Sequence, residues 1–128
     1  MKCGIDLIHQ NRIEDLVTRR GVEYLSKIWT RQEIDDCTRK DKTLKYESLA
    51  ARYAAKEAVS KAFGTGFGRE GVRLDEIEIL ENALGAPYVV LHGTTRTFYK
   101  NNGYQQIEVS LSHDKDISIA MCVLKEKI

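Results

Sequence analysis

Long apolar runs, proline and paired cysteines are scarce in this sequence of 128 residues, and each absence excludes a class of protein. No apolar run approaches the roughly 20 residues that a membrane-spanning helix needs, and Asp6 comes too early for a signal peptide. The three cysteines are widely spaced, with neither a CxxC pair nor an even count. We therefore expect a cytoplasmic protein with reduced thiols, no membrane association and no structural zinc site.

An excess of charge is also missing. Twenty basic and 19 acidic residues leave a formal charge of +1, which gives no support for a general attraction to nucleic acid. The basic residues nevertheless cluster in one part of the chain. Such a cluster is typical of a site for an acidic protein partner or a phosphate-rich ligand, and it is equally typical of the solvated faces of ordinary helices. The cluster lies near the N-terminus, at Arg12, Arg19, Arg20, Arg31, Arg39, Lys40, Lys42 and Lys45.

The order of the hydrophobic patterns predicts a single α+β domain over residues 1–128. A strand over Cys3–Ile8 precedes helices that begin near Asn11 and at Thr30, where Thr30 and Glu33 have the spacing of a capping box. After residue 68 the period changes from helical to alternating. We expect N-terminal helices packed on an antiparallel sheet, with later elements at Ile77–Ile79, Tyr88–Leu91, Thr94–Asn101 (a short helix), Ile107–Leu111 and Ile117–Leu124.

The segment from Glu47 to Gly68 is the most informative part of the chain. It is rich in strong helix formers, and Gly64 stands where the C-terminus of a helix is expected. At about 100° per residue, the alanines share one arc and the charged residues share the other. The charged arc predicts either a solvated face with a Glu57–Lys61 pair or a fixed array of charges that meets a ligand. Its members are Arg52, Tyr53, Lys56, Glu57 and Lys61.

Asp6 interrupts the otherwise apolar first strand. A carboxylate is costly to bury unless a partner compensates its charge. One explanation is an ion pair with Arg12 or Lys61. The other is a hard-metal site, because Mg²⁺ typically takes one or two carboxylates together with water and substrate phosphates. Asp6 and Glu57 form such a pair of carboxylates if the first strand lies beside the Ala-rich helix.

Two further groups of residues are compatible with phosphate binding. Ser110, Ser112 and His113 lie near the end of a predicted strand, and they fit phosphate binding or turn capping. A hydrolase triad is disfavoured, because triad members meet in space and the sequence has no nucleophile elbow. The Gly64–Gly66 turn follows a helix and therefore lacks the helix N-terminus that binds phosphate. It either ends the helix or lets the backbone approach a ligand.

Four motifs occur in order along the chain: Gly4-Ile5-Asp6 with Arg12-Ile13, Thr30-x-x-Glu33, Arg52-x-Ala54-Ala55-Lys56-Glu57-Ala58-x-x-Lys61-Ala62-x-Gly64-Thr65-Gly66, and Ser110-Leu111-Ser112-His113. In this order they resemble the holo-acyl-carrier-protein synthases, the small bacterial 4′-phosphopantetheinyl transferases. The resemblance spans nearly the whole chain, and residues 52–66 are its most specific part. Trp29 stands where an aromatic residue such as Phe is usual, and Asn82-x-x-Gly85-x-Pro87 also resembles a family segment.

The resemblance implies transfer of 4′-phosphopantetheine from coenzyme A to a serine of apo-acyl carrier protein, in support of fatty acid biosynthesis. It also implies Mg²⁺ dependence and a homotrimer with active sites between neighbouring subunits. Asp6 and Glu57 match the metal-binding carboxylates, Lys61 matches a lysine near the diphosphate, and Arg12 matches an arginine on the carrier-docking side. The positions that match coenzyme A contacts are Arg52, Gly64, Thr65, Gly66, Ser112 and His113.

These residue types suit cleavage of a diphosphate, where charge on the oxygens must be neutralised by Mg²⁺ and a lysine. The resemblance casts Lys61 as the group that stabilises charge on the leaving phosphate. The carrier serine loses its proton either to Glu57 directly or to a metal-bound water beside it, with Asp6 as the weaker candidate. Acyl carrier proteins are acidic, which gives the N-terminal basic cluster a partner.

Three rival hypotheses fit parts of the sequence. A module that binds coenzyme A or a nucleotide without chemistry has no need of both Asp6 and Glu57. A purely structural oligomeric domain predicts that Glu57→Gln is silent, whereas a transferase predicts near-complete loss of activity with folding intact. A transferase for polyketide or peptide synthetase carriers is the third hypothesis, and the short chain favours the fatty-acid carrier type.

Overall fold

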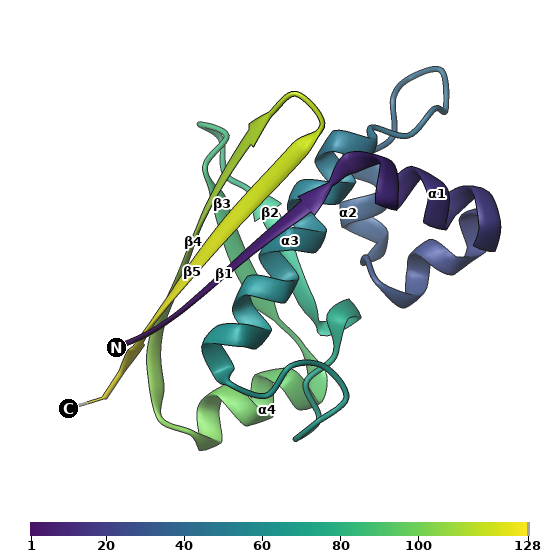
Figure 1. Ribbon diagram of the computed structural model, residues 1–128. Coiled ribbons are helices and arrows are strands. Elements are labelled where there is room, and N and C mark those ends of the chain that lie inside the picture. The colour runs from purple at the N-terminus through teal and green to yellow at the C-terminus, as the bar shows by residue number, and fades with distance from the viewer. Residues whose placement is uncertain (128) are drawn as a thin grey trace.

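A central helix with a sheet on either side organises the computed structural model, which describes residues 1–127 (Figure 1). The helix is α3 (Tyr46–Phe63). The larger sheet has the strand order β1-β5-β4, and the smaller one is the antiparallel pair β2-β3. This confirms the expected α+β fold, with the difference that the antiparallel strands form two sheets. The strands are β1 (Lys2–His9), β2 (Ile77–Glu81), β3 (Pro87–Leu91), β4 (Tyr104–Asp114) and β5 (Ile117–Glu126).

Shorter helices cover both ends of α3 (Figure 1). Helix α1 begins at Gln10, close to the start expected near Asn11, and His9 stands at its N-cap. The predicted capping box is confirmed at the start of α2: the Thr30 hydroxyl accepts from the Glu33 amide, and the Glu33 carboxylate accepts from the Thr30 amide. These helices are α1 (Gln10–Arg20), the 3₁₀ helix η1 (Val22–Lys27), α2 (Arg31–Asp36), the 3₁₀ helix η2 (Leu74–Glu76) and α4 (Gly93–Asn101).

Strand β1 lies against α3 at very close range, and glycine makes this possible. A Cβ atom added at Gly4 would overlap the carbonyl oxygen of Ala58. Ala54, Ala55 and Ala58 are fully buried. Small residues on the helix therefore face a glycine on the strand, and the two backbones approach closely. Because side chains alternate along a strand, Asp6 points toward α3 as Gly4 does. The proximity of the first strand to the Ala-rich helix is therefore confirmed.

The other face of the larger sheet is covered by no element within residues 1–127, and it lies toward the viewer in Figure 1. Along β5, Ala120, Cys122 and Leu124 are buried against α3, while the residues between them belong to the open face. Ile5, Leu7 and Met121 are exposed on that open face. It therefore combines regular backbone pairing with an apolar, solvent-facing surface.

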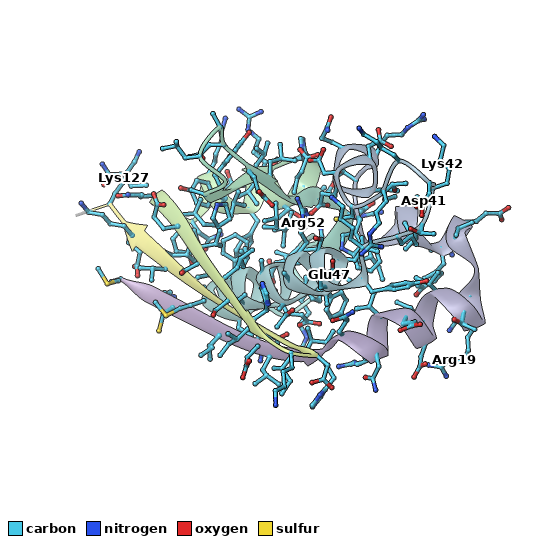
Figure 2. All side chains as sticks on the ribbon, turned by 90° about the horizontal axis from the view of Figure 1, so that it is seen from above. Arg19, Asp41, Lys42, Glu47, Arg52 and Lys127 are labelled. Atoms are coloured by element: carbon cyan, nitrogen blue, oxygen red, sulfur yellow. The ribbon has the colours of Figure 1, made fainter. Side chains whose placement is uncertain are left out.

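The predicted single charged arc of α3 is wrong for two of its members. Arg52 is only 5% exposed and Lys56 is fully buried. Figure 2 shows Arg52 inside the molecule, whereas Arg19 and Lys42 extend from its edge. The cause is that α3 is packed between two sheets, so both sides of the helix are enclosed. Glu57 and Lys61 alone keep partly open surroundings among the charged members of this arc.

The cysteine prediction agrees with the structure. Cys37 and Cys122 are buried, Cys3 is exposed, and all three thiols are free. Burial raises the pKa of both buried thiols to about 12, so they stay protonated and inert. Within the described residues, no helix is both long and apolar enough to span a membrane.

Candidate functional site

Asp6, Glu57 and Lys61 meet where β1 crosses α3. The Lys61 Nζ donates to Asp6 Oδ1 at 3.0 Å and to the carbonyl oxygen of Ile5 at 3.0 Å. Of the two ion-pair partners expected for Asp6, the structure therefore has Lys61. Glu57 precedes Lys61 by four residues, which places both side chains on the same side of α3.

The charges around Glu57 act on its pKa in opposing directions. Burial raises the pKa of Glu57, and the negative charge of Asp6 raises it further. A hydrogen bond from Tyr53 and the positive charges of Lys61 and Arg12 act in the opposite direction. Burial, with help from Glu57, raises the pKa of Tyr53 to about 12, so its hydroxyl keeps the proton that it donates.

This pair of carboxylates fits Mg²⁺. A divalent cation relieves the repulsion between two nearby carboxylates, and Mg²⁺ is usually held by one or two of them, with water and substrate phosphates completing the shell. Residues 1–127 contain no cluster of three or more His, Cys, Asp or Glu side chains suited to a metal. Two carboxylates would hold Mg²⁺ only with water and substrate oxygens completing its shell, and they do not suit a closed structural metal.

A groove of about 310 Å³ lies between α1, η1 and α3, next to this cluster. Arg12 lines it, and the same Arg12 influences Glu57. Arg19 and Lys27 add positive charge to its rim, and Tyr24 and Tyr53 contribute aromatic surface. Lys27 also lies 5.4 Å from the centre of the Tyr24 ring. The groove is therefore basic at its edge and aromatic inside.

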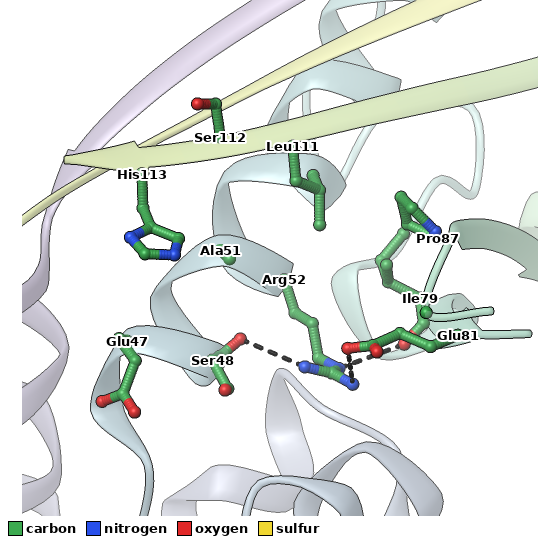
Figure 3. A pocket seen from close by; sticks show the side chains of 11 residues that line it. Glu47, Ser48, Ala51, Arg52, Ile79, Glu81, Pro87, Leu111, Ser112 and His113 are labelled. Carbon is green, nitrogen blue, oxygen red and sulfur yellow. Dashed lines mark hydrogen bonds and ion pairs between the residues drawn. The ribbon is translucent and has the colours of Figure 1, made fainter. Parts of the chain in front are cut away.

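A second pocket, of about 330 Å³, lies on another side of α3, where the helix faces β2, β3 and the end of β4 (Figure 3). Arg52 and His113, two of the predicted coenzyme A contacts, both line it. Figure 3 shows the His113 ring turned toward α3 and the Ser112 hydroxyl directed away from Arg52. The register explains this, because Ser112 pairs with Ile119 on the open face of the sheet. Ser112 borders the pocket without aiming its hydroxyl into it.

The predicted coenzyme A contacts therefore divide into two groups on one chain. Arg52 precedes Glu57 by five residues, which is a rotation of about 140° around α3. The Gly64–Gly66 turn follows the opposite end of the helix, roughly 18 Å along the axis from Arg52. Gly64 and Gly66 both have positive φ, +80° and +65°, which glycine adopts without strain. The turn begins three residues after Lys61, at the end of α3 that lies away from Arg52.

Comparison with known proteins identifies the family. The family model of the 4′-phosphopantetheinyl transferase superfamily matches residues 2–122. This chain belongs to that superfamily. A holo-acyl-carrier-protein synthase of Ruminiclostridium cellulolyticum is 45% identical to this transferase, over 97% of this chain and 91% of that protein. A synthase of the same name from Halothermothrix orenii is 38% identical over 96% of this chain and 95% of that protein.

Solved structures agree with the fold of this transferase. The holo-acyl-carrier-protein synthase of Helicobacter pylori, a structure in complex with coenzyme A, has a TM-score of 0.83 and 32% identity. That comparison covers 96% of this chain and 99% of the other. The synthase of Neisseria meningitidis has a TM-score of 0.87 and 29% identity, with 98% of each chain covered. The resemblance inferred from the motifs is confirmed.

The transferase also contains a buried ion pair that the sequence did not predict. Lys56 Nζ lies 2.6 Å from Glu33 Oε1, and both side chains are fully buried. The lysine also donates to the carbonyl oxygens of Leu74 and Ile77. Burial raises the pKa of Glu33 and lowers that of Lys56, while their mutual attraction opposes both shifts. The capping box indicated Glu33, but no local signal joined it to Lys56.

Proposed function

We propose that this transferase moves the 4′-phosphopantetheine group of coenzyme A to a serine of apo-acyl carrier protein, leaving adenosine 3′,5′-bisphosphate. The observation that carries the proposal is the meeting of Asp6, Glu57 and Lys61 beside the basic groove at Arg12. The names of the relatives and the motifs support the same reaction. We also propose that it acts in the cytoplasm, as one domain over residues 1–128, and supports fatty acid biosynthesis.

Each member of the cluster has a proposed role. Asp6 and Glu57 hold Mg²⁺, which when bound neutralises charge on the diphosphate oxygens. The side chain of Lys61 is half exposed. In the reaction it leaves Asp6, contacts the leaving phosphate and stabilises the negative charge of that phosphate. Glu57, directly or through a water beside it, takes the proton of the carrier serine. Tyr53 orients Glu57 through its hydroxyl.

The basic groove is the proposed docking site of the acidic carrier. Arg12, Arg19 and Lys27 present positive charge on the side of α1 and η1 that borders Glu57. Opposite charges on the two partners steer their encounter and fix their orientation. The carrier serine is then delivered to the carboxylate that accepts its proton.

We further propose a homotrimer whose active sites lie between neighbouring subunits. Two observations support it. The open face of the larger sheet is apolar, with Ile5, Leu7 and Met121 exposed, and such a surface is typical of an interface between copies. The two groups of coenzyme A residues also lie on different sides of α3, so two neighbouring chains complete one ligand site more readily than one chain does. Arg52 and His113 of one subunit would then complement Lys61 and Gly64–Gly66 of the next.

An intact-mass assay tests the reaction, with the protein, apo-acyl carrier protein, coenzyme A and Mg²⁺. We expect one phosphopantetheine adduct on the carrier, and its loss when EDTA is added. Glu57→Gln should abolish the adduct while leaving the unfolding curve intact, and Asp35→Asn, at an exposed carboxylate on α2, serves as the matched control. A carrier without adduct, and without any effect of EDTA, would refute the proposal.

Arg12→Glu tests the docking site. We expect a raised KM for the carrier with a nearly unchanged kcat, because charge reversal weakens the encounter and leaves the chemistry in place. Glu14→Lys reverses a charge on the same helix in the opposite direction and is the control. An unchanged carrier KM in Arg12→Glu would remove Arg12 from the docking surface.

A further inference from the structure

The guanidinium of Arg52 is rigidly held in the second pocket. Its Nε donates to the carbonyl oxygen of Ile79 at 3.2 Å, and its Nη1 donates to that of Ser48 at 3.4 Å. Only 5% of the residue is exposed. Figure 3 shows the Ser48 contact on one side of the guanidinium and the Ile79 and Glu81 contacts on the other, and Glu81 is the partner of Nη2. The Nη2 edge that faces the pocket is therefore the part of Arg52 available to an anion.

Glu81 occupies this edge, but loosely. The distance from Arg52 Nη2 to Glu81 Oε1 is 3.5 Å, well beyond the 2.7–2.9 Å of a charge-assisted hydrogen bond. The side chain of Glu81 is 55% exposed, and within residues 1–127 this is its one ion pair. The pair is half-buried, with Arg52 enclosed and Glu81 in solvent, and it is weak because it is elongated and because solvent screens and competes for the Glu81 carboxylate. Glu81 can leave Arg52 at little cost, while Arg52 stays in place.

The other acid on the pocket rim is engaged elsewhere. Glu47 also lines the pocket, yet its carboxylate pairs with Arg39 at 3.4 Å. Arg52 is consequently the one Lys or Arg side chain that lines this pocket, and Glu81 is the one carboxylate paired with it. The pocket contains a fixed cation and a removable anion.

We propose that Glu81 is a built-in competitor for the anion site of Arg52, so that a phosphate group of coenzyme A binds there by displacing it. The inference rests on the proposed function, because it assumes that Arg52 meets coenzyme A. A phosphate dianion carries twice the charge of a carboxylate and replaces it favourably, whereas a monoanion gains nothing from the exchange. Glu81 thus lowers the affinity for coenzyme A and makes the pocket selective for phosphate over singly charged ligands.

The test is Glu81→Gln, which keeps the size of the side chain and removes its charge. Calorimetric titration with adenosine 3′,5′-bisphosphate should show affinity about two- to fivefold tighter than in the wild type, the range expected for loss of one weak pair. Glu47→Gln removes an equal charge from the same rim without touching Arg52, and its affinity should stay within about 1.5-fold of wild type. Acetate should compete more strongly in Glu81→Gln than in the wild type.

Two results would overturn the proposal. Weaker or unchanged binding in Glu81→Gln would mean that Glu81 orients Arg52 or is irrelevant to it. An equal gain in Glu47→Gln would mean that general charge, and not competition at Arg52, sets the affinity.

Failure of the proposed function can be told apart from failure of this inference. If the wild type modifies the carrier and Glu81→Gln binds no more tightly, the inference alone fails. If the wild type forms no adduct, inorganic phosphate replaces the nucleotide as the probe, and the NMR signal of the Arg52 Nε–H is followed. That signal should shift at a lower phosphate concentration in Glu81→Gln; identical titrations in the two proteins would refute the competition itself.

Discussion

Lys56→Met is the most informative test of how α3 is held in place. The lysine is fully buried, and its ammonium contacts three oxygens: Glu33 Oε1 at 2.6 Å, the Leu74 carbonyl at 3.1 Å and the Ile77 carbonyl at 2.5 Å. Methionine fills a similar volume without a donor. The variant therefore leaves a buried carboxylate without its cation and removes one hydrogen bond from each of two carbonyl oxygens, of which that of Leu74 keeps the bond from the Ile77 amide.

The expected cost follows from the partners that remain. Removing one member of a buried ion pair typically costs about 3–5 kcal/mol. Glu33 keeps its hydrogen bonds from the amides of Thr30 and Ile79, so we expect the lower end, about 3 kcal/mol. A domain of this size is stable by roughly 5–15 kcal/mol, so the loss is large but leaves a folded protein.

The pH dependence gives the prediction a second signature. Burial already raises the pKa of Glu33, and Lys56 opposes that rise. Without Lys56 the folded pKa rises further above the unfolded value, so the folded variant binds a proton that the unfolded chain releases. Stability then falls as pH increases through the window above about 4.5. Lys56→Met should accordingly be less damaging at pH 5 than at pH 8.

Urea unfolding followed by the fluorescence of Trp29 measures both effects. Trp29 is the single tryptophan, it is fully buried, and its indole donates to the carbonyl oxygen of Leu49. With a slope of about 2 kcal/mol per molar, a loss of about 3 kcal/mol lowers the urea midpoint by about 1.5 M. All variants must be compared at one protein concentration, because assembly of subunits adds to apparent stability.

A midpoint shift below about 0.5 M, equal at both pH values, would refute this reasoning. The double variant Glu33→Gln with Lys56→Met provides the matched control, because it removes both charges and keeps an acceptor oxygen for one of the two amides. It should be more stable than Lys56→Met alone. If it is less stable, the uncompensated carboxylate is not the cause of the loss.

Three further predictions follow from other contacts. Burial opposes ionisation of Glu78, but hydrogen bonds from Thr30 and His92 prevail and lower the pKa of this carboxyl group. Ionised Glu78 therefore stabilises the folded protein at pH values above its unfolded pKa, and this stabilisation is lost on acidification. Urea unfolding should therefore show Glu78→Gln destabilised at pH 7 and nearly equal to wild type near pH 3. Gly4→Ala should cost about 1–3 kcal/mol and weaken both Mg²⁺-dependent activity and thermal stability, because the new methyl group separates β1 from α3; unaltered activity would show that this contact is not needed. A thiol reagent should label Cys3→Ser only after denaturation, since the remaining thiols are buried; rapid labelling of the folded variant would contradict this.

Local signals in the sequence were sufficient for the elements of this fold. Thr30 and Glu33 predicted the start of α2 because a capping box is satisfied within four residues. Gly64 predicted the end of α3 because the left-handed conformation found there favours glycine. Asp6 was informative for the same reason: a carboxylate in an apolar strand requires a partner nearby. Such signals need no knowledge of what packs on the element.

The arrangement of α3 could not be predicted in this way. A helical wheel assumes one buried and one solvated face, and on that assumption Arg52 and Lys56 belong with Glu57. The structure places a second sheet on that side, so the carbonyls of β2 and the carboxylate of Glu33 become available as partners. The three oxygens around Lys56 belong to residues 18 to 23 positions away in the chain. The sequence pattern does not indicate these contacts.

The contrast between Lys56 and its neighbour Glu57 connects the architecture with the proposed chemistry. Adjacent residues point about 100° apart on a helix, so the rotation of α3 that buries Lys56 also turns Glu57 toward β1 and Asp6. Apolar packing is non-directional and tolerates small rotations, whereas three oxygens fixed around one ammonium do not. Replacing Glu33 and Lys56 by an apolar pair would therefore restore stability but leave the orientation of Glu57 less fixed. A variant that regains its urea midpoint but not its rate of carrier modification would show that the buried pair acts on position as well as on stability.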